Sequence, residues 1–519
     1  MENTQAPSNT QHAIRNTQHA TRNTQHASRL MFDVSRFTSH VSRIAILAVL
    51  ALALALRLWG LGNESLWFDE AYSVAFARDR VSPATFVYLV APAYHAFLHF
   101  WLWLGEADWL VRLPSALFGA ATVYVVYRLG RSLWGEASGL LAGLFLAVSP
   151  LHVWYSQEAR MYTLATLLVS AGSWLFWSLI SGDGSGRHDV GRTLGYVGAM
   201  IVALYTHSFA GFVLLFHNLY LAWRLLVRRE VSWRLAGLWA LSQAAVALLT
   251  IPLLWGTLIQ QGQGYWGWID LRYGPASWRG LARVLADFSL GGEPAWPTAV
   301  RWGLLLVYGA LAVAGALRRG DGEPRWKLDR SWAFTAGLLA VPIGVVFVLS
   351  QVRNVFVPRY MVPFLPAFVL LLARGVRNLP WRSATLATTM LILAVSGVAV
   401  TQAYLRQDKE DWRGTAARVA AEEKPGDYIF LMDEDVLIPF SFYYHGPATI
   451  QTVWRGRTEV DVLQKLVDGA ASAHPRVWLV MSHTTNMLLK QMLVQDSRLR
   501  LAYEEELVGV YLARFDRVQ

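Results

Sequence analysis

The chain has 519 residues, of which 54% are hydrophobic and 16% are charged, and its mean hydropathy is +0.32. Soluble domains carry about a quarter charged residues, so this composition excludes a single soluble globule and predicts a multi-pass membrane protein. The net charge of +10 lies mainly in Arg residues of short loops between apolar runs, a topology signal that argues against a nucleic-acid partner. The absence of Cys excludes disulfides, thiolate metal sites and cysteine nucleophiles.

The N-terminal segment is a polar, low-complexity tract. Residues 1 to 30 repeat Asn-Thr-Gln-His-Ala, a composition that cannot bury a core, so we predict that residues 1–42 are disordered. The first apolar run, Ile44 to Leu61, is about as long as the roughly 20 residues that a bilayer-crossing helix needs. No small-residue cleavage site follows it, which favours a retained anchor over a signal peptide.

Ten further apolar runs bring the prediction to about eleven transmembrane helices in a mainly α fold. They lie near residues 110–127, 137–150, 161–180, 194–206, 208–223, 235–257, 299–317, 331–350, 361–373 and 383–402. With the N-terminus inside, every Arg-rich short loop falls on the cytoplasmic side. The outer side then holds the loop after the first run, the turn 151–160, the loop 260–296, the turn 351–360 and the tail.

The tail differs in character from the rest of the chain. Tyr428 to Met432 and Val477 to Met481 are predicted as buried strands, and Asn486 to Gln495 as a helix. Residues 403–519 should therefore form a small extracytoplasmic α/β domain after a transmembrane domain at 43–402. The less apolar segment Val81 to Leu104 is predicted to form helices along the membrane surface.

Two adjacent carboxylates, Asp69 and Glu70, follow the first span directly. Neighbouring residues on a helix point about 100° apart, so the two acids cannot share one proton as a glycosidase pair would, and they need separate roles. The alternative is that both simply stabilise the first turn of a surface helix.

Three motifs and Arg57 resemble the GT-C glycosyltransferases of family 39, which include protein O-mannosyltransferases and bacterial aminoarabinose transferases. The motifs are Ser65-Leu-Trp-Phe-Asp-Glu-Ala-Tyr72, Pro150-Leu-His-Val-Trp-Tyr-Ser-Gln-Glu-Ala-Arg-Met-Tyr162 and Pro358-Arg-Tyr-Met-Val-Pro363. The resemblance covers roughly residues 43 to 400. It implies catalytic roles for Asp69 and Glu70, with a polyprenyl monophosphate sugar as donor at the outer membrane face.

With such a donor the leaving group is already a stabilised phosphate, so one carboxylate base can activate the acceptor hydroxyl. Asp69 suits that role, whereas Glu70 would orient a cation or a neighbouring Arg. Direct displacement by one base predicts inversion at the sugar carbon.

The same motifs supply the candidate substrate-binding residues. Arg160 and Arg359 enter apolar runs from outer turns, where a cation is costly without a partner; they would hold the carrier phosphate, or instead pair with Glu158, Glu70 or Asp69. Arg57 either contacts substrate or snorkels to the membrane surface. The set is completed by the motif residues Tyr72, Tyr155, Glu158, Tyr162 and Tyr360.

Metal binding stays open. Relatives often carry His-Pro-Pro in the first outer loop, where this chain has Ala91-Pro-Ala-Tyr-His95, so a metal-binding role of that His is not carried over. His95 or His99 would be the substitute. The sequence contains no convincing metal cluster and demands no cofactor, although a divalent metal remains compatible with it.

The sequence therefore predicts an integral membrane glycosyltransferase of a cell membrane, with a bacterial plasma membrane as the expected location. Its expected partners are a polyprenyl-phosphate-linked sugar, an extracytoplasmic lipid, protein or glycan acceptor, and the bilayer. The alternative function is a transporter or flippase for lipid-linked sugars, which many spans and intramembrane Arg would also suit.

Overall fold

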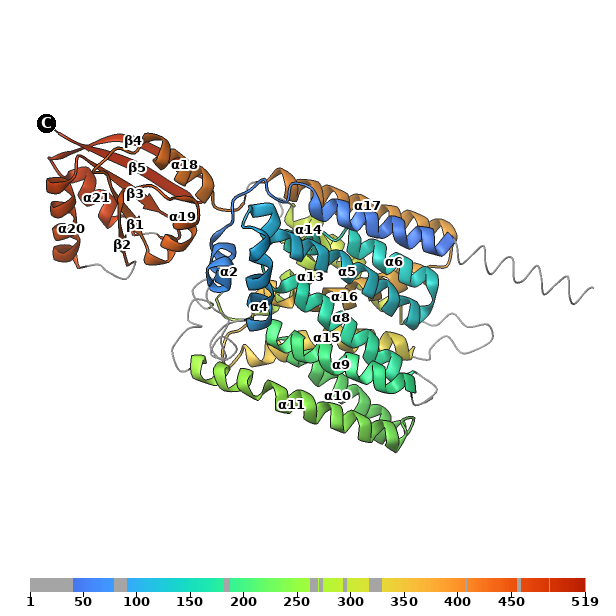
Figure 1. Cartoon of the computed structure of the whole chain (residues 1–519). Helices are drawn as coiled ribbons and strands as arrows, with labels where there is room; N and C mark the ends of the chain where they lie inside the picture. The colour runs from blue at the N-terminus through green and yellow to red at the C-terminus, as the bar shows by residue number, and fades with distance from the viewer. Residues whose placement is uncertain are drawn as a thin grey trace, which may run out of the picture.

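The helices of the chain run side by side in one bundle, and a small sheet domain lies beyond one end of it (Figure 1). This computed structural model describes residues 41–78, 91–181, 187–261, 269, 274–292, 296–316, 329–406, 408–454, 459–484 and 486–518. The predicted disordered segment 1–42 falls almost entirely outside these residues.

The multi-pass, mainly helical fold predicted from the sequence is confirmed. Among the described residues, eight helices are long and apolar enough to cross a membrane. They are Val41–Leu58, α5 (Asp108–Trp134), α8 (Tyr162–Ile180), α10 (Ala210–Ala222) with η2 (Trp223–Val227), Trp233–Gly256 of α11 (Trp233–Gln261), α15 (Arg330–Leu349), η3 (Pro358–Phe364) with α16 (Leu365–Arg377), and α17 (Arg382–Leu405).

Judged by length and composition, the described residues contain eight spans, fewer than the predicted eleven. A bent pair, α6 (Glu136–Ala147) and α7 (Pro150–Ser156), gives a ninth span if it counts as one. The two remaining predicted runs, near 194–206 and 299–317, correspond to shorter apolar helices, Val190–Thr206 of α9 (Arg187–Thr206) and α14 (Thr298–Ala314).

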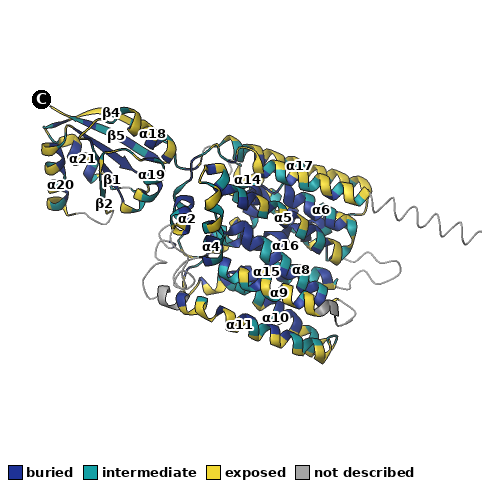
Figure 2. Cartoon of the chain, viewed as in Figure 1, coloured by how far each residue is buried: buried dark blue, intermediate teal, exposed yellow. Residues whose placement is uncertain are grey.

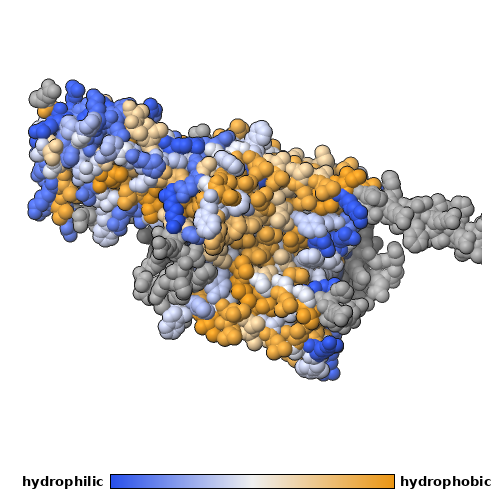
Figure 3. Space-filling view, viewed as in Figure 1, coloured by the Kyte–Doolittle hydropathy of each residue, from blue (hydrophilic) through white to orange (hydrophobic). Residues whose placement is uncertain are grey.

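The distribution of buried and apolar residues in the bundle is the one expected for a protein in a lipid bilayer. In the most apolar 18-residue window of the span that contains α16, 83% of the residues are buried. The corresponding share is 22% for α11 and for α17, which lie at the outside of the bundle (Figure 2). Apolar side chains cover the flank of the bundle, and polar ones gather toward its ends and on the tail (Figure 3). Exposed Leu and Trp on the flank would be costly in water and are favourable against lipid tails.

The break between α6 and α7 explains the position of Arg57. Pro150 lacks an N–H and begins a new helix, and the two helices meet at 60°. Arg57 donates to the carbonyls of Leu146 at 3.2 Å and Ala147 at 3.0 Å, so it satisfies groups at the end of α6. Its side chain is fully buried, which is contrary to the predicted snorkelling.

Short helices cover one end of the bundle. They are α2 (Phe68–Arg78), α4 (Pro92–Trp101), η1 (Leu102–Leu104) and α13 (Trp278–Leu290). The described part of the predicted surface segment 81–104 is helical, as expected. The helix α13 was not predicted, because it lies in a segment that the sequence analysis treated as a loop.

The tail is an α/β domain, as predicted. Its strands are β1 (Tyr428–Met432), β2 (Thr449–Val453), β3 (Arg476–Met481), β4 (Leu499–Leu507) and β5 (Val510–Arg517), in the order β2-β1-β3-β5-β4. The first three are parallel, with Tyr428 beside Thr449 and Val477, and the last two are antiparallel.

Two pairs of helices enclose this sheet. Residues of α18 (Trp412–Glu422) and α19 (Leu437–Tyr443) share one core with the sheet, and those of α20 (Val460–Ala473) and α21 (Leu488–Gln495) share the other. The division of the chain near residue 402 remains a proposal. In the structure α17 continues to Leu405.

Candidate active site

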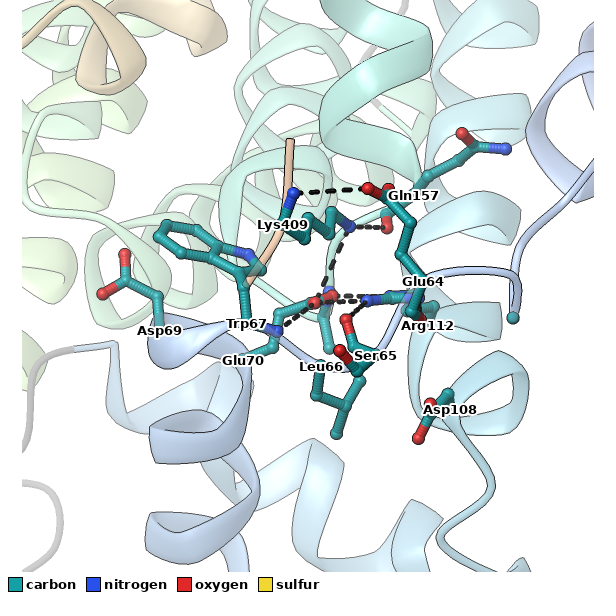
Figure 4. A network of polar contacts seen from close by, with 12 residues as sticks. Glu64, Ser65, Leu66, Trp67, Asp69, Glu70, Asp108, Arg112, Gln157 and Lys409 are labelled. Carbon is teal, nitrogen blue, oxygen red and sulfur yellow. Dashed lines mark hydrogen bonds and ion pairs between the residues drawn. The ribbon is translucent and has the colours of Figure 1, made fainter. Parts of the chain in front are cut away.

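Asp69 and Glu70 lie in the first turn of α2, where the positive end of the helix dipole favours acids. Their side chains point to opposite sides of the helix start (Figure 4). Each therefore has its own set of partners.

Asp69 brings together two of the predicted arginines. Arg359 Nη1 lies 2.9 Å from Asp69 Oδ2, and Arg160 Nη2 lies 3.6 Å from the same oxygen. Arg160 also donates to the Asp69 carbonyl at 3.0 Å and to Ser73 Oγ at 3.1 Å, which fixes it on α2. The carboxylate is 19% exposed, so it remains accessible at the edge of this cluster.

Glu70 is instead fully enclosed. Arg112 Nε and Nη2 donate to its two oxygens at 2.8 Å and 2.6 Å, and the Ala159 N–H donates at 2.7 Å. Burial by itself would raise the pKa of Glu70, but the charges of Arg112 and Lys409 outweigh it and lower the pKa to about 2. Glu70 thus ties α2 to α5, consistent with the predicted role of orienting a neighbouring Arg.

Arg112 holds the loop that leads into α2. It donates to the carbonyls of Leu61 at 3.0 Å, Glu64 at 2.8 Å and Ser65 at 2.8 Å, in addition to Glu70. A guanidinium offers five N–H donors in a rigid fork, which allows one side chain to fix a whole turn. No sequence motif pointed to Arg112. Its position in an apolar run could have done so, because a cation there needs a partner, as at Arg160.

A cavity of about 650 Å³ lies beside this cluster, between α7, α13 and α17. Its polar wall includes Glu158, Arg283, Asp287, Arg359, Gln402, Arg406, Asp408 and Lys409, and its aromatic wall Trp67, Trp154, Tyr155 and Phe288. Arg359 connects the cavity with the cluster at Asp69, because it lines the cavity and contacts the Asp69 carboxylate.

Glu158 is one of two buried acids in the wall of this cavity, the other being Asp287. Glu158 is 3% exposed, and its Oε2 has no hydrogen-bond partner among the described residues. Burial raises its pKa to about 7, against the opposing charges of Lys409 and Arg359. A buried carboxyl in a cavity that titrates near neutral pH is typical of a functional site.

The predicted tyrosines take different positions. Tyr155 lines the cavity and meets Tyr162 edge to face, with ring centres 5.0 Å apart. The ring centre of Tyr360 lies 6.5 Å from that of Tyr162. Neither of these two tyrosines lines the cavity; they are connected to it through Tyr155. The Tyr72 hydroxyl donates to Asp435 Oδ1 at 2.9 Å and so faces the tail.

Of the predicted substrate-binding residues, Tyr155, Glu158 and Arg359 therefore line the cavity, and Arg160 adjoins it through Asp69. Arg57 is absent from the cavity wall and serves the end of α6 instead.

The described residues offer no metal site: no three of their His, Asp or Glu side chains form a group that could hold an ion. His95 is buried between the rings of Phe76 and Tyr94, and His99 Nδ1 lies 2.7 Å from the Ala77 carbonyl oxygen.

One family model and several solved structures match this chain. Residues 90–255 match the family model described as dolichyl-phosphate-mannose-protein mannosyltransferase. ArnT from Cupriavidus metallidurans, in the apo state, aligns over 90% of this chain and 97% of its own, with 16% identity and a TM-score of 0.57. The fold is that of a GT-C glycosyltransferase. The GT-C resemblance predicted from the sequence motifs is thereby confirmed.

Two further structures share the GT-C fold. ArnT bound to undecaprenyl phosphate aligns over 90% of this chain and 97% of its own, at 16% identity and a TM-score of 0.56. The Archaeoglobus fulgidus oligosaccharyltransferase in complex with Zn and sulfate aligns over 90% of this chain and 72% of its own, at 11% identity and a TM-score of 0.51. A comparison with curated proteins found no match.

Proposed function

We propose that this chain is an integral membrane glycosyltransferase that moves one sugar from a polyprenyl monophosphate carrier to an acceptor outside the cytoplasm. One observation carries the proposal: Arg359 lines the cavity and holds Asp69 at 2.9 Å. A cation suited to bind phosphate and a carboxylate suited to act as a base thus lie side by side. The GT-C fold, which this chain shares with ArnT bound to undecaprenyl phosphate, supports the same conclusion.

The donor would lie in the cavity with its phosphate at Arg359. A guanidinium donates two parallel bonds to phosphate oxygens and stabilises the charge that builds on a leaving group. The apolar side chains of α13 and α17 in the wall, such as Val284, Phe288 and Ala399, suit the first isoprene units of the carrier. Trp67, Trp154 and Tyr155 offer faces for the sugar ring, and Glu158 accepts from its hydroxyls.

Transfer then requires one displacement. The acceptor oxygen bonds to the anomeric carbon as the bond from that carbon to the phosphate oxygen breaks, and the electron pair leaves with the phosphate. Asp69 takes the proton of the acceptor hydroxyl. Glu70 cannot compete for this proton, because both of its oxygens are bound to Arg112 inside the protein.

The alternative function, a transporter or flippase, is less favoured. A flippase needs no base, whereas Asp69 lies partly exposed beside two cations, one of which, Arg359, lines the cavity. The experiment that decides is to incubate the purified protein with a panel of polyprenyl phosphate sugars and membrane extract, and to identify the product by mass spectrometry. A sugar on a new acceptor, with released polyprenyl phosphate, supports transfer; movement of intact donor across vesicles without cleavage supports the alternative.

We expect the tail and the active site to face the outer side of the membrane, because this orientation leaves all Arg-rich short loops in the cytoplasm. Reporter fusions after Arg406 measure this directly in a bacterial host. Alkaline phosphatase should be active and a cytoplasm-dependent fluorescent protein dark. The reverse pattern would overturn the placement of Asp69 as well, since the tail contacts α2.

Arg359→Lys should weaken donor binding by about 10-fold or more, because Lys keeps the charge but loses the two-pronged donor. The measurement is the affinity for a polyprenyl phosphate titrated into purified protein. Arg353→Lys is the matched control, since Arg353 is exposed on the same outer turn and does not line the cavity. Equal affinity in both variants would remove Arg359 from phosphate recognition.

A further inference from the structure

The helix that carries Asp69 has no capping side chain directly before it. The first N–H groups of an α-helix lack a partner within the helix, and a Ser, Thr, Asp or Asn just before it usually supplies the acceptor. α2 begins at Phe68, and the residue before it is Trp67, whose indole offers no acceptor. Glu70 Oε2 reaches back to the Trp67 N–H at 3.3 Å, which leaves the Phe68 N–H to be bound from elsewhere.

A carboxylate of the tail binds this N–H. Glu410 lies 342 residues further along the chain, and its Oε2 accepts from the Phe68 N–H at 2.8 Å. The Glu410 carbonyl accepts from Ser65 Oγ at 2.7 Å, so the same residue also holds the chain that enters the helix. The positive end of the α2 dipole favours a negative charge at this position. Glu410 is therefore the N-terminal cap of α2, supplied by the tail.

Three parts of the tail contact Glu410. Its Oε1 lies 2.8 Å from His483 Nε2, just after β3, and its Oε2 also accepts from Trp412 Nε1 at 3.3 Å, at the start of α18. The turn between β4 and β5 packs against its stem, because a Cβ on Gly509 would lie 2.8 Å from Glu410 Cγ. His483 has a φ of 54°, which residues other than Gly rarely adopt. Only 12% of the Glu410 side chain is exposed, so the fold of the tail sets the cap in place.

Further contacts from the tail lie on both sides of Asp69 in the chain. Tyr443 Oη accepts from the Leu66 N–H at 2.7 Å, three residues before Asp69. The Tyr72 hydroxyl donates to Asp435 Oδ1 at 2.9 Å, three residues after it. The Asp69 carboxylate, in contrast, contacts arginines of the bundle. The tail thus holds the first turn of α2, while the bundle holds the carboxylate that this turn carries.

We propose that Glu410 is a positioning residue for sugar transfer: its carboxylate caps α2 and so fixes Asp69 relative to Arg359, which makes the tail a part of the active site. This inference rests on the proposed function. A base must lie within hydrogen-bond distance of the proton that it takes, and a displacement of about 1 Å can cost about 100-fold in rate. Without an acceptor for the Phe68 N–H the first turn of α2 would fray, and Asp69 would lose its fixed position beside Arg359.

Amide hydrogen exchange tests the cap without any activity assay. The full chain is purified in nanodiscs, and exchange is followed by mass spectrometry in peptides that cover residues 65–72. We expect Glu410→Ala to raise exchange in this segment by about 5-fold or more, and Glu410→Gln, which keeps an acceptor oxygen, to stay near wild type. Glu506→Ala is the matched control, since Glu506 is an exposed acid of β4 in the tail. Equal exchange in Glu410→Ala and wild type would overturn the inference.

Turnover gives the second readout once a donor is known. Glu410→Ala should lower kcat by about 10-fold or more with little change in the affinity for polyprenyl phosphate, and Glu410→Gln should recover most of the rate. In an Asp69→Asn background, Glu410→Ala should lower kcat little further, because the base that it positions is already lost. A folded Glu410→Ala protein with normal kcat, or with a loss of donor affinity in place of kcat, would overturn the positioning role.

Glu410→Asp replaces Glu410→Ala if the alanine variant does not fold, because its shorter side chain withdraws the acceptor from the Phe68 N–H and keeps the charge. Its exchange and its kcat should change in the same directions. If no donor supports turnover, the proposed function fails, while hydrogen exchange still decides whether Glu410 caps α2.

Discussion

Asp69→Asn should lower turnover by about 100-fold or more, the usual scale for loss of a general base, while the protein still binds donor. The amide keeps the shape of the side chain but cannot take the proton of the acceptor hydroxyl. Donor affinity should not fall, because Arg359 loses a competing carboxylate 2.9 Å away and keeps its donors for the phosphate. The measurement pairs steady-state rates with titration of polyprenyl phosphate.

Asp461→Asn is the matched control for this variant. Asp461 is an exposed acid of the tail helix α20 and does not line the cavity. Its turnover should stay within a few-fold of wild type. Near-normal turnover by a folded, donor-binding Asp69→Asn protein would remove Asp69 from the role of base.

Glu70→Ala should destabilise the protein by about 3 to 5 kcal/mol, the scale for breaking a buried ion pair from one side, because Arg112 and Lys409 would keep buried charges without their carboxylate. Thermal unfolding in detergent or nanodiscs measures the loss. Glu106→Ala is the control, since its ion pair with Arg78 is exposed and such pairs contribute about 0 to 1 kcal/mol. Equal melting temperatures of the two variants would contradict the assigned role of Glu70.

The role of Glu70 also predicts how the stability of the protein changes as the pH falls. The pKa of Glu70 is lowered to about 2 in the folded protein, so its contribution is present above the ordinary Glu value of about 4.3 and is lost as the pH falls toward 2. The Glu70→Gln protein should not show this part of the loss of stability on acidification. A wild-type and a Glu70→Gln protein that lose stability in parallel between about pH 4 and pH 2 would contradict it.

Much of the fold was accessible from the sequence because apolar runs and a change of composition are local signals. The long spans, the tail with β1 and β3, and the helix α21 all follow from windows of a few residues to about 20 residues. The exceptions have physical reasons. α13 is a helix of 13 residues inside a predicted loop, and α6 and α7 meet at a Pro break that hydropathy alone does not register.

The site was only partly accessible for a different reason. The outer-loop motifs led to Asp69, Arg160 and Arg359, which the structure brings together. The pairing of Arg112 and Lys409 with Glu70 links positions 42 and 339 residues apart in the chain, and such pairs depend on tertiary packing that one sequence does not encode in any local pattern. Arg57 shows the converse: the resemblance included it beside the three motifs, whereas in the structure it donates to backbone carbonyls of α6.

A single-turnover reaction with a polyprenyl phosphate sugar labelled at the anomeric carbon tests the proposed displacement most directly. We expect wild-type protein to release one free polyprenyl phosphate for each sugar transferred to the acceptor, with inversion of the anomeric configuration in the product. Asp69→Asn should form the donor complex but should not proceed to product. Retention of configuration, or full product formation by Asp69→Asn, would contradict displacement assisted by this base.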